Sequence, residues 1–484
     1  MVVNSINFLI FFVVVFTVYY LPICGKAPRF QNLWLLLTSY FFYGFADWKM
    51  VPLLLGANIV FFCIGLWLKS EMEKGHVKNA SNITTLGVLL GVGVLLYFKY
   101  LNFFAESFAQ LLGAIGLTVS WTTLNIVLPI GVSFFTFKLI SYVIEIHREH
   151  IQPSKDIVEF GTYIAFFPTL LSGPIDRPNS FLPQLWVVRR FNYDLAVDGC
   201  RQILWGMFTK ICIADNLAIL TDETWNNIAG SNGSTLLLSA LLYPIQMYAD
   251  FDGYSNMAIG VGKLLGINVT KNFNHPFLAR NIAEYWRNWH ISLTGWLTDY
   301  VFQPLNIAFR YIGHFGIIYA VIINFLLIGL WHGANLTFLL FGLYHGVLYV
   351  PLILSGSYIR RKKLQPNKYH LPKLKDFVNM ASTFFMVSIG LILFRASTVK
   401  QAYEFIYSLI NSSILIIPND PLTFLKLLVI CLVYLLIEWV QRKKDHDLDI
   451  SFKSPILRYV IYFIVFFLTI SGSGNPKTFI YLQF

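Results

Sequence analysis

Two histidines carry the strongest chemical signal in this sequence. His290 closes the block Glu284-Tyr-Trp-Arg-Asn-Trp-His290, and His332 follows an apolar run that extends from Phe315 to Trp331. A neutral imidazole can take the proton from a hydroxyl group while the hydroxyl oxygen attacks a thioester. Ionisable groups are costly at membrane depth and are functional there by default. His332 is therefore a candidate catalytic base and His290 its candidate partner, but for a lone histidine in a membrane span the residues alone favour a buried structural histidine held by one hydrogen bond.

Polar and aromatic residues in and beside the two histidine blocks are candidate substrate contacts. The tryptophans could line a channel for an acyl donor, or they could belong to the aromatic belt at a membrane interface. Arg287 could meet a phosphate group, but we favour an ion pair between Arg287 and Glu284. The predicted contacts in this region are Trp286, Arg287, Asn288, Trp289 and Trp331.

Two acidic residues form a further candidate contact region. Asp250 and Asp252 follow the apolar run Leu236 to Tyr248, among small and hydroxyl-bearing residues. We predict that they line a polar cavity at the end of a membrane span. They could polarise a histidine or cap the next short helix, and we favour the cap.

Several well-known chemical motifs are absent. The sequence contains no P-loop, no HExxH zinc helix and no GxSxG nucleophile elbow. None of the five cysteines forms a CxxC pair. The sequence therefore indicates neither a metal site nor a tightly bound cofactor.

The elements that must position these residues are membrane helices. Hydrophobic residues make up 56% of the 484-residue chain and charged residues only 13%, so lipid must be the solvent. The first apolar run, Ile6 to Ile23, has no basic segment before it and is interpreted as a retained span. The run Asn125 to Ile146 is broken by Pro129-Ile-Gly131 and should face protein or a water-filled cavity. Together the apolar runs predict roughly eleven to thirteen spans.

Basic loops set the predicted orientation, because loops rich in Lys and Arg stay in the cytoplasm. The segment Arg360 to Lys375 holds seven such residues, and Arg442 to Lys444 holds three in a row. Placing both in the cytoplasm puts both termini outside. The net charge of +11 is explained by such loops and by contact with anionic membrane lipid, so nucleic acid is not a predicted partner.

Several segments are similar to those of one known family. They are Leu128-Pro-Ile-Gly-Val-Ser-Phe-Phe-Thr-Phe137, Ser172-Gly-Pro-Ile-Asp-Arg-Pro178, Asn272-Phe-Asn-His-Pro-Phe-Leu-Ala-Arg280, Tyr285-Trp-Arg-Asn-Trp-His-Ile-Ser292 and Asn324-Phe-Leu-Leu-Ile-Gly-Leu-Trp-His-Gly-Ala334. In this order they resemble the membrane-bound O-acyltransferase family, in the branch of alginate O-acetyltransferase membrane subunits and peptidoglycan-acetylating relatives. Two features depart from that branch: Thr298 replaces its usual arginine, and the loop after Pro304-Leu-Asn is short.

The resemblance implies an all-α polytopic membrane protein. In this fold a ring of roughly 11–13 transmembrane helices, with short re-entrant or interfacial helices, surrounds a central tunnel. His332 would be the essential histidine of the family and His290 its second motif histidine. Residues 1–484 would form a single membrane domain, with N-terminal helices in 1–110, a core with both histidines in 120–355 and C-terminal helices in 377–484.

The function expected from the resemblance is O-acetylation of a cell-envelope polysaccharide. An acetyl group, with acetyl-CoA as the expected donor, would cross the bacterial cytoplasmic membrane in which the protein is embedded. An extracytoplasmic acetyltransferase would be its partner protein. One alternative is D-alanyl transfer to teichoic acid from a carrier protein. The other is a proton-coupled transporter or flippase, although no internal repeat of the kind found in many transporters is visible.

Overall fold

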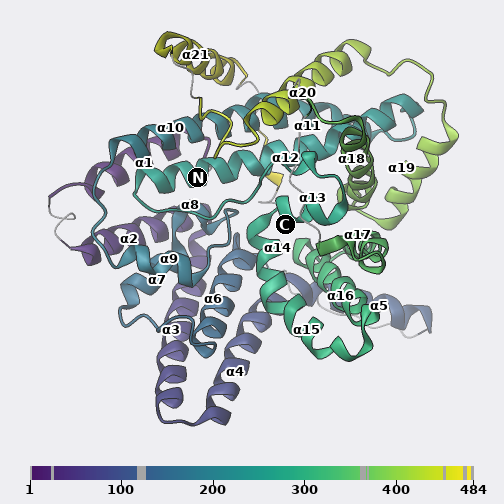
Figure 1. Cartoon of the computed structure of the whole chain (residues 1–484). Helices are drawn as coiled ribbons and strands as arrows, with labels where there is room; N and C mark the ends of the chain where they lie inside the picture. The colour runs from purple at the N-terminus through teal and green to yellow at the C-terminus, as the bar shows by residue number, and fades with distance from the viewer. Residues whose placement is uncertain are drawn as a thin grey trace. The chain divides into compact units, whose positions relative to one another are not determined.

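Helices account for the regular structure of this protein. The structure, a computed structural model, describes residues 3–22, 27–116, 127–359, 367, 370–450, 454–472 and 477–480. Within these ranges no strand occurs, which confirms the predicted all-α class (Figure 1). Part of the basic segment Arg360 to Lys375, and the last four residues of the terminal Phe479 to Phe484, lie outside the described residues.

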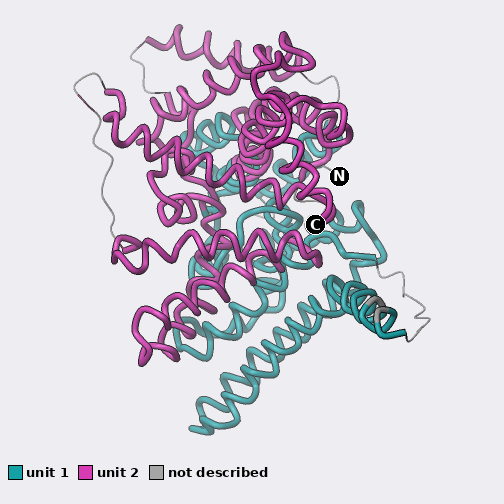
Figure 2. Tube along the Cα trace, turned by 90° about the vertical axis from the view of Figure 1, so that its right-hand side faces the viewer, with its two compact units in different colours: residues 1–203, 257–270 teal, residues 204–256, 271–484 magenta. Residues whose placement is uncertain are grey.

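Two compact units divide the chain, one of residues 1–203 with 257–270 and one of residues 204–256 with 271–484 (Figure 2). Two of the three boundaries fall inside helices, α10 (Tyr193–Phe208) and α12 (Gly233–Leu264), and the third falls in the irregular segment after α12. Each unit is described by itself below. The expectation that residues 1–484 form one domain stays a prediction.

The first unit consists of the N-terminal helices. They are α1 (Ile6–Tyr19), α2 (Pro28–Asp47), α3 (Val51–Glu73), α4 (Val77–Leu95), α5 (Leu101–Ala114), α6 (Val132–His147), α7 (Ile157–Ala165), α8 (Phe167–Leu170) and α9 (Pro178–Leu185). Helix α6 begins directly after Pro129-Ile-Gly131, where Gly131 has a φ of 76° and a Cβ would lie 2.4 Å from the Leu170 carbonyl oxygen. Almost all of α6 is buried, including Lys138, whose Nζ lies 2.9 Å from Thr169 Oγ1. The broken helix therefore faces protein, as predicted.

The second unit contains both motif histidines. Its helices besides the parts of α10 and α12 are α11 (Asp215–Asn226), α13 (Ile282–Asn288), α14 (Ile291–Leu297), α15 (Gln303–Ala308), α16 (His314–His332), α17 (Leu336–Leu354), α18 (Leu374–Arg395), α19 (Val399–Asn411), α20 (Pro421–Gln441) and α21 (Pro455–Ser471).

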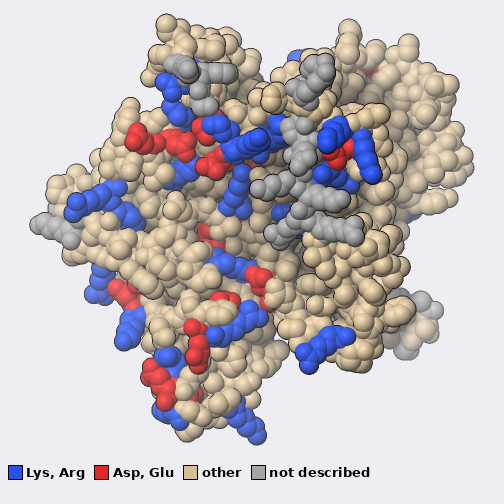
Figure 3. Space-filling view, viewed as in Figure 1, with Lys and Arg blue, Asp and Glu red and all other residues tan. Residues whose placement is uncertain are grey.

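Seven helical segments of the described chain are long and apolar enough to cross a bilayer, which confirms an integral, multi-pass membrane protein. They are Pro28–Glu73, Val77–Gly113, Tyr193–Asn226, His314–His332, Leu336–Leu354, Leu374–Arg395 and Pro421–Gln441. Some of them are longer than one crossing requires, since a span needs about 20 residues, so the total of eleven to thirteen stays a prediction. Figure 3 shows charged side chains gathered in the middle and lower left of this face, with large areas around them that carry none and are suited to contact with lipid.

The hairpin of α16 and α17 fixes the position of His332. A Cβ on Gly329 would lie 2.1 Å from the Phe338 carbonyl oxygen, and one on Gly342 would lie 2.3 Å from the Phe325 carbonyl oxygen. Only hydrogen fits at these two positions, so the two backbones approach closely, as small residues allow in membrane helices. His332 is the last residue of α16 and lies beside the short turn to α17.

Candidate active site

Trp331 brings the two motif histidines together. Its ring centroid lies 5.0 Å from that of His332 and 5.5 Å from that of His290, with both pairs edge to face. Both histidines are buried, with 2% of His332 and 1% of His290 exposed. The sequence left open whether these two residues meet, and within this unit they share one indole as a common neighbour.

His290 is held in a defined orientation by Asn272. The residue precedes α14 with a φ of 45°, a left-handed conformation that is uncommon for residues other than glycine. Its Nδ1 lies 3.0 Å from Asn272 Oδ1, which also accepts a hydrogen bond from Ser292 Oγ at 2.9 Å. An amide oxygen only accepts, so His290 donates from Nδ1 and its other nitrogen carries the lone pair. Burial lowers the pKa of His290 to about 3, so the ring is neutral at working pH.

Aromatic rings surround His332. The ring centroid of Phe394 lies 4.9 Å from that of His332, that of Phe341 lies 6.2 Å away and that of Phe338 6.3 Å away. These rings come from α17 and α18, so three helices of the unit enclose this imidazole. A general base at this position would have to be a neutral imidazole.

A third buried histidine, His345 of α17, was not predicted from the sequence. Trp286 donates a hydrogen bond from Nε1 to His345 Nδ1 at 3.2 Å. The His345 ring centroid lies 4.7 Å from that of Phe341, the same ring that contacts His332. His345 could have been found from the sequence, because it is an ionisable residue inside an apolar run, which is the criterion that selected His332. Trp286 thus binds a histidine, but that histidine is His345 and neither His290 nor His332.

The ion pair predicted between Glu284 and Arg287 is wrong. Glu284 instead pairs with Arg280, at 2.8 Å from Nη2 to Oε1 and 3.2 Å from Nε to Oε2. The reason is local, since Arg280 precedes α13 and its guanidinium folds back onto the first turn of that helix. Arg287 lies in the last turn and donates to the carbonyl oxygen of Tyr358 at 2.9 Å.

The two other predicted contacts of this region differ in burial. Trp289 is buried and stacks on Tyr285 at a centroid distance of 5.4 Å, so it belongs to the packed core of the unit. Asn288 is half-buried, and its carbonyl oxygen accepts a hydrogen bond from the backbone N–H of Asn274 at 3.0 Å.

The helix-cap interpretation of Asp250 and Asp252 is also wrong, because both lie in the middle of the 32-residue helix α12. A cap needs an unpaired helix terminus, and the chain continues as helix through this segment. Asp250 binds Lys210 Nζ at 2.6 Å and accepts a hydrogen bond from the backbone N–H of Ile480 at 2.7 Å. Asp252 accepts from Asn256 Nδ2 at 2.7 Å.

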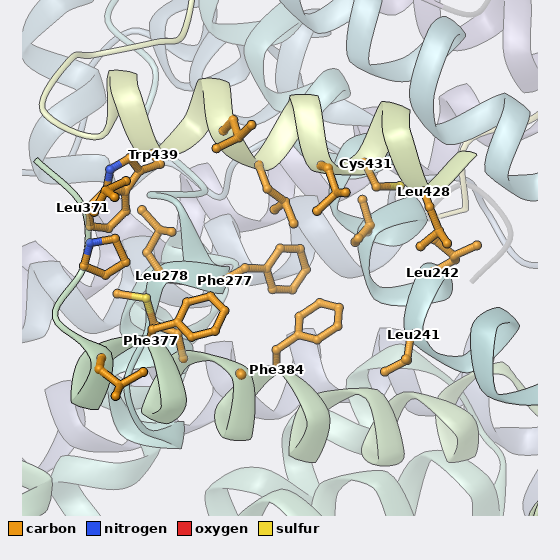
Figure 4. Close-up of a pocket in the computed structure, with 18 of the residues that line it drawn as sticks. Leu241, Leu242, Phe277, Leu278, Leu371, Phe377, Phe384, Leu428, Cys431 and Trp439 are labelled. Atoms are coloured by element: carbon orange, nitrogen blue, oxygen red, sulfur yellow. The ribbon is translucent and has the colours of Figure 1, made fainter. Parts of the chain in front are cut away.

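A large apolar cavity of the second unit lies apart from these histidines. Its volume is about 810 Å³, and its walls come mainly from α12, α18 and α20 (Figure 4). Phe277 and Phe384, both in its lining, contact each other edge to face, with ring centroids 5.1 Å apart. The lining is almost entirely hydrocarbon, so it can hold an acyl chain or a lipid tail but supplies no catalytic group.

The sequence that forms these helices is similar to a known class of membrane enzyme. Residues 147–393 match the membrane-bound O-acyltransferase family, and the chain belongs to that family. It is therefore an O-acyltransferase.

The names of three relatives of this chain refer to alginate, peptidoglycan and teichoic acid. This chain is 33% identical over 463 residues to the probable alginate O-acetylase AlgI of Pseudomonas aeruginosa, and the alignment covers 94% of this chain and 84% of the relative. It is 28% identical over 422 residues to the peptidoglycan O-acetyltransferase of Helicobacter pylori, covering 80% of this chain and 75% of the relative. The match to the teichoic acid D-alanyltransferase of Bacillus subtilis is 32% over 226 residues, covering 43% and 55%.

Proposed function

We propose that this O-acyltransferase takes an acetyl group from acetyl-CoA on the cytoplasmic side of a bacterial membrane and passes it across for O-acetylation of a cell-envelope polysaccharide. The observation that carries the proposal is the pair of buried histidines on either side of Trp331. Its support from comparison is the match to the alginate O-acetylase over 94% of the chain.

In the proposed reaction His332 is the general base. The acceptor hydroxyl oxygen attacks the thioester carbonyl carbon while the imidazole takes the hydroxyl proton. The carbon–sulfur bond then breaks, and the proton passes from the imidazolium to the departing thiolate, which leaves as the free thiol. Base catalysis of this kind supplies on the order of 10²–10⁴-fold in rate. His290, fixed by Asn272, is the positioning partner across Trp331.

The donor and partner belong to the same proposal. Coenzyme A carries phosphates, and Arg287, in the last turn of α13, is the proposed contact for them. An extracytoplasmic acetyltransferase is the proposed partner protein, and the polysaccharide is the final acceptor. D-alanyl transfer is the second candidate, but the matching D-alanyltransferase covers only 43% of this chain.

The test is acetyl transfer by purified protein in proteoliposomes supplied with radiolabelled acetyl-CoA. His332→Ala should abolish transfer, a loss on the order of 10²–10⁴-fold, while membrane insertion and folded yield stay near those of the unchanged protein. His290→Ala should reduce transfer less completely. An active His332→Ala protein would remove the base role. Transfer from a D-alanyl carrier but not from acetyl-CoA would select the second candidate.

A further inference from the structure

Three side chains that the proposed chemistry does not use converge elsewhere in the second unit. They are His275, Glu438 and Asp447, and their ligand atoms all lie within 4.8 Å of one another. His275 precedes the short turn Pro276–Leu278, Glu438 lies near the end of α20, and Asp447 lies in the loop after it. All three are buried, with exposed fractions of 8%, 0% and 6% respectively.

The polar atoms at the centre of this cluster are unsatisfied. Within the described part of the chain, His275 Nδ1, Glu438 Oε2 and Asp447 Oδ1 have no hydrogen-bond partner. The distance from His275 Nδ1 to Glu438 Oε1 is 3.7 Å, which is longer than a hydrogen bond. Glu438 Oε1 is occupied by the hydroxyl of Tyr248, which donates to it at 2.5 Å. Buried polar atoms without partners are rare, and several that face one another point to an absent ligand.

The charge of the cluster indicates that this ligand is a cation. Asp252 of α12 interacts electrostatically with Glu438, Asp447 and His275, so three buried carboxylates share this region. Lys271 acts electrostatically on Asp252 and Asp447, but its Nζ lies 3.3 Å from Asn274 Oδ1, and among the described residues it forms no close ion pair with these acids. Burying three carboxylates without a closely paired cation is costly, and a bound divalent ion would offset that cost.

We propose that His275, Glu438 and Asp447 bind a divalent first-row metal ion, of the class represented by Zn²⁺ and Mn²⁺. An imidazole nitrogen with two carboxylate oxygens is a ligand set for Zn²⁺, and carboxylates also suit Mn²⁺. Ligands of a tetrahedral Zn²⁺ lie roughly 3.3 Å apart, so small side-chain rotations would close the present spacing around the ion. Tyr248 of α12 donates a hydrogen bond to Glu438 and would orient this carboxylate toward the metal ion.

The position of the site gives the ion a structural role. It fastens the end of α20 and the loop after it to the segment that leads into α13 and His290. His275 has a φ of 49°, a strained conformation that persists only where the surroundings over-determine it, and a metal bond would do so. Tyr248 also contacts Trp289 at a centroid distance of 6.0 Å, so the site lies close to the motif segment without including it.

The test is the metal content of the full chain, purified in detergent through a tag that contains no histidine. Elemental analysis should find about one Zn²⁺ or Mn²⁺ per chain. His275→Gln, Glu438→Gln and Asp447→Asn should each lower metal affinity by at least about tenfold. Asp449→Asn is the matched control, because Asp449 pairs with Lys444 at 3.4 Å outside the cluster, and it should keep its metal.

A second measurement uses the unchanged protein alone, so it does not depend on variants that fold. Chelation should lower its melting temperature, and added Zn²⁺ or Mn²⁺ should restore it, since a ligand that binds only the folded state stabilises it. The proposal is overturned if the purified protein holds less than about 0.1 ion per chain after incubation with either metal. It is also overturned if the three ligand variants retain metal as well as Asp449→Asn does.

Discussion

At the scale of single residues, two imidazoles on either side of one indole are held in different ways. His290 is fixed by the amide of Asn272, whereas His332 is enclosed by rings of Phe338, Phe341 and Phe394. A hydrogen-bonded ring keeps its tautomer and orientation, which suits a positioning group. The hydrogen bond from His290 to Asn272 therefore supports the positioning role proposed for His290. His332, at the end of α16 beside the turn to α17, is the proposed base.

The pKa of His290 predicts a specific pH dependence of stability. Its folded-state pKa is about 3, well below the unfolded value near 6.5, so between these two values the unfolded chain binds more protons. Stability should therefore fall as the pH is lowered below 6.5, by about 2 kcal/mol at pH 5 from this residue. The melting temperature in detergent should drop less between pH 7 and pH 5 in His290→Gln than in the unchanged protein.

The control for this measurement is His314→Gln, at the exposed start of α16, which should leave the drop unaltered. An equal drop in the unchanged protein and in His290→Gln would contradict the assignment of a buried, neutral His290.

Replacing Arg280 should affect mainly the stability of the protein, whereas replacing Arg287 should affect mainly its use of the acyl donor. Arg280→Ala removes the guanidinium that bridges Glu284 and Asp376, and we expect it to cost about 1 kcal/mol, as partly exposed ion pairs do. Arg287→Ala removes one hydrogen bond to a carbonyl oxygen and should leave the melting temperature nearly unchanged. If Arg287 meets donor phosphates, this variant should raise the KM for acetyl-CoA. A parallel fall in yield and in donor use would make Arg287 structural.

Sequence reasoning located the two histidines but not their neighbours. His290 and His332 were found because ionisable groups in apolar runs are conspicuous, and Trp331 was found as the aromatic neighbour of His332. The sequence could not show whether Glu284 pairs with Arg280 or with Arg287, since both arginines are three or four residues from it. Which arginine pairs with Glu284 depends on where α13 begins. The cluster of His275, Glu438 and Asp447 was missed because its members are far apart in sequence and match no spacing motif.

At the scale of elements, apolar runs predicted where helices lie, but they did not predict where a helix continues past charged residues. Two further apolar runs of the sequence are Leu336 to Leu354 and Phe377 to Phe394. The first has the same bounds as α17, and the second lies within α18. In contrast, α12 continues through Asp250 and Asp252, where a span was expected to end. Buried carboxylates can lie within a continuous helix where partners offset the cost of their burial, and Lys210, the Ile480 backbone N–H and Asn256 are those partners.

The contact between α16 and α17 gives an element-scale prediction. Gly342→Ala would put a Cβ 2.3 Å from the Phe325 carbonyl oxygen, so the helices must separate and His332 must move with α16. We expect a loss of about 1–3 kcal/mol in stability, as for other overpacked sites, together with a loss of acetyl transfer. Thermal unfolding and transfer assays on the same preparation measure both.

The matched control is Gly93→Ala in α4, where an added Cβ would meet nothing within 4 Å. It should be neutral or slightly stabilising, because alanine favours a helix more than glycine does. If both variants behave alike, the close approach of α16 and α17 does not constrain the site.

At the scale of the whole molecule, composition predicted a membrane protein but could not predict how the chain divides into compact units. A chain with 56% hydrophobic residues must have lipid as its solvent, and seven segments long enough to span a bilayer confirm this. The division into two units at positions inside α10 and α12 has no counterpart in composition, because both helices are continuous in sequence and structure.

Membrane orientation is the prediction that belongs to this scale. The basic segments Arg360 to Lys375 and Arg442 to Lys444 flank α18, α19 and α20. Helices α18 and α20, of 22 and 21 residues, can each cross a bilayer, whereas α19 has 13 residues and at 1.5 Å per residue is roughly 20 Å long, too short to cross. Two crossings return the chain to the same side, so both basic segments should lie in the cytoplasm, as basic loops generally do.

Reporter fusions test this arrangement directly. Alkaline phosphatase, which is active only outside the cytoplasm, should be inactive when fused within Arg360 to Lys375 or after Lys444. It should be active when fused in the loop between α19 and α20, at residues 412–420, which serves as the matched control. Activity at either basic segment would reverse the orientation, because the seven Lys or Arg residues of Arg360 to Lys375 would then face outward. A donor from the cytoplasm would in that case have to approach the opposite face of the protein, so the proposed direction of acetyl transfer would fail with it.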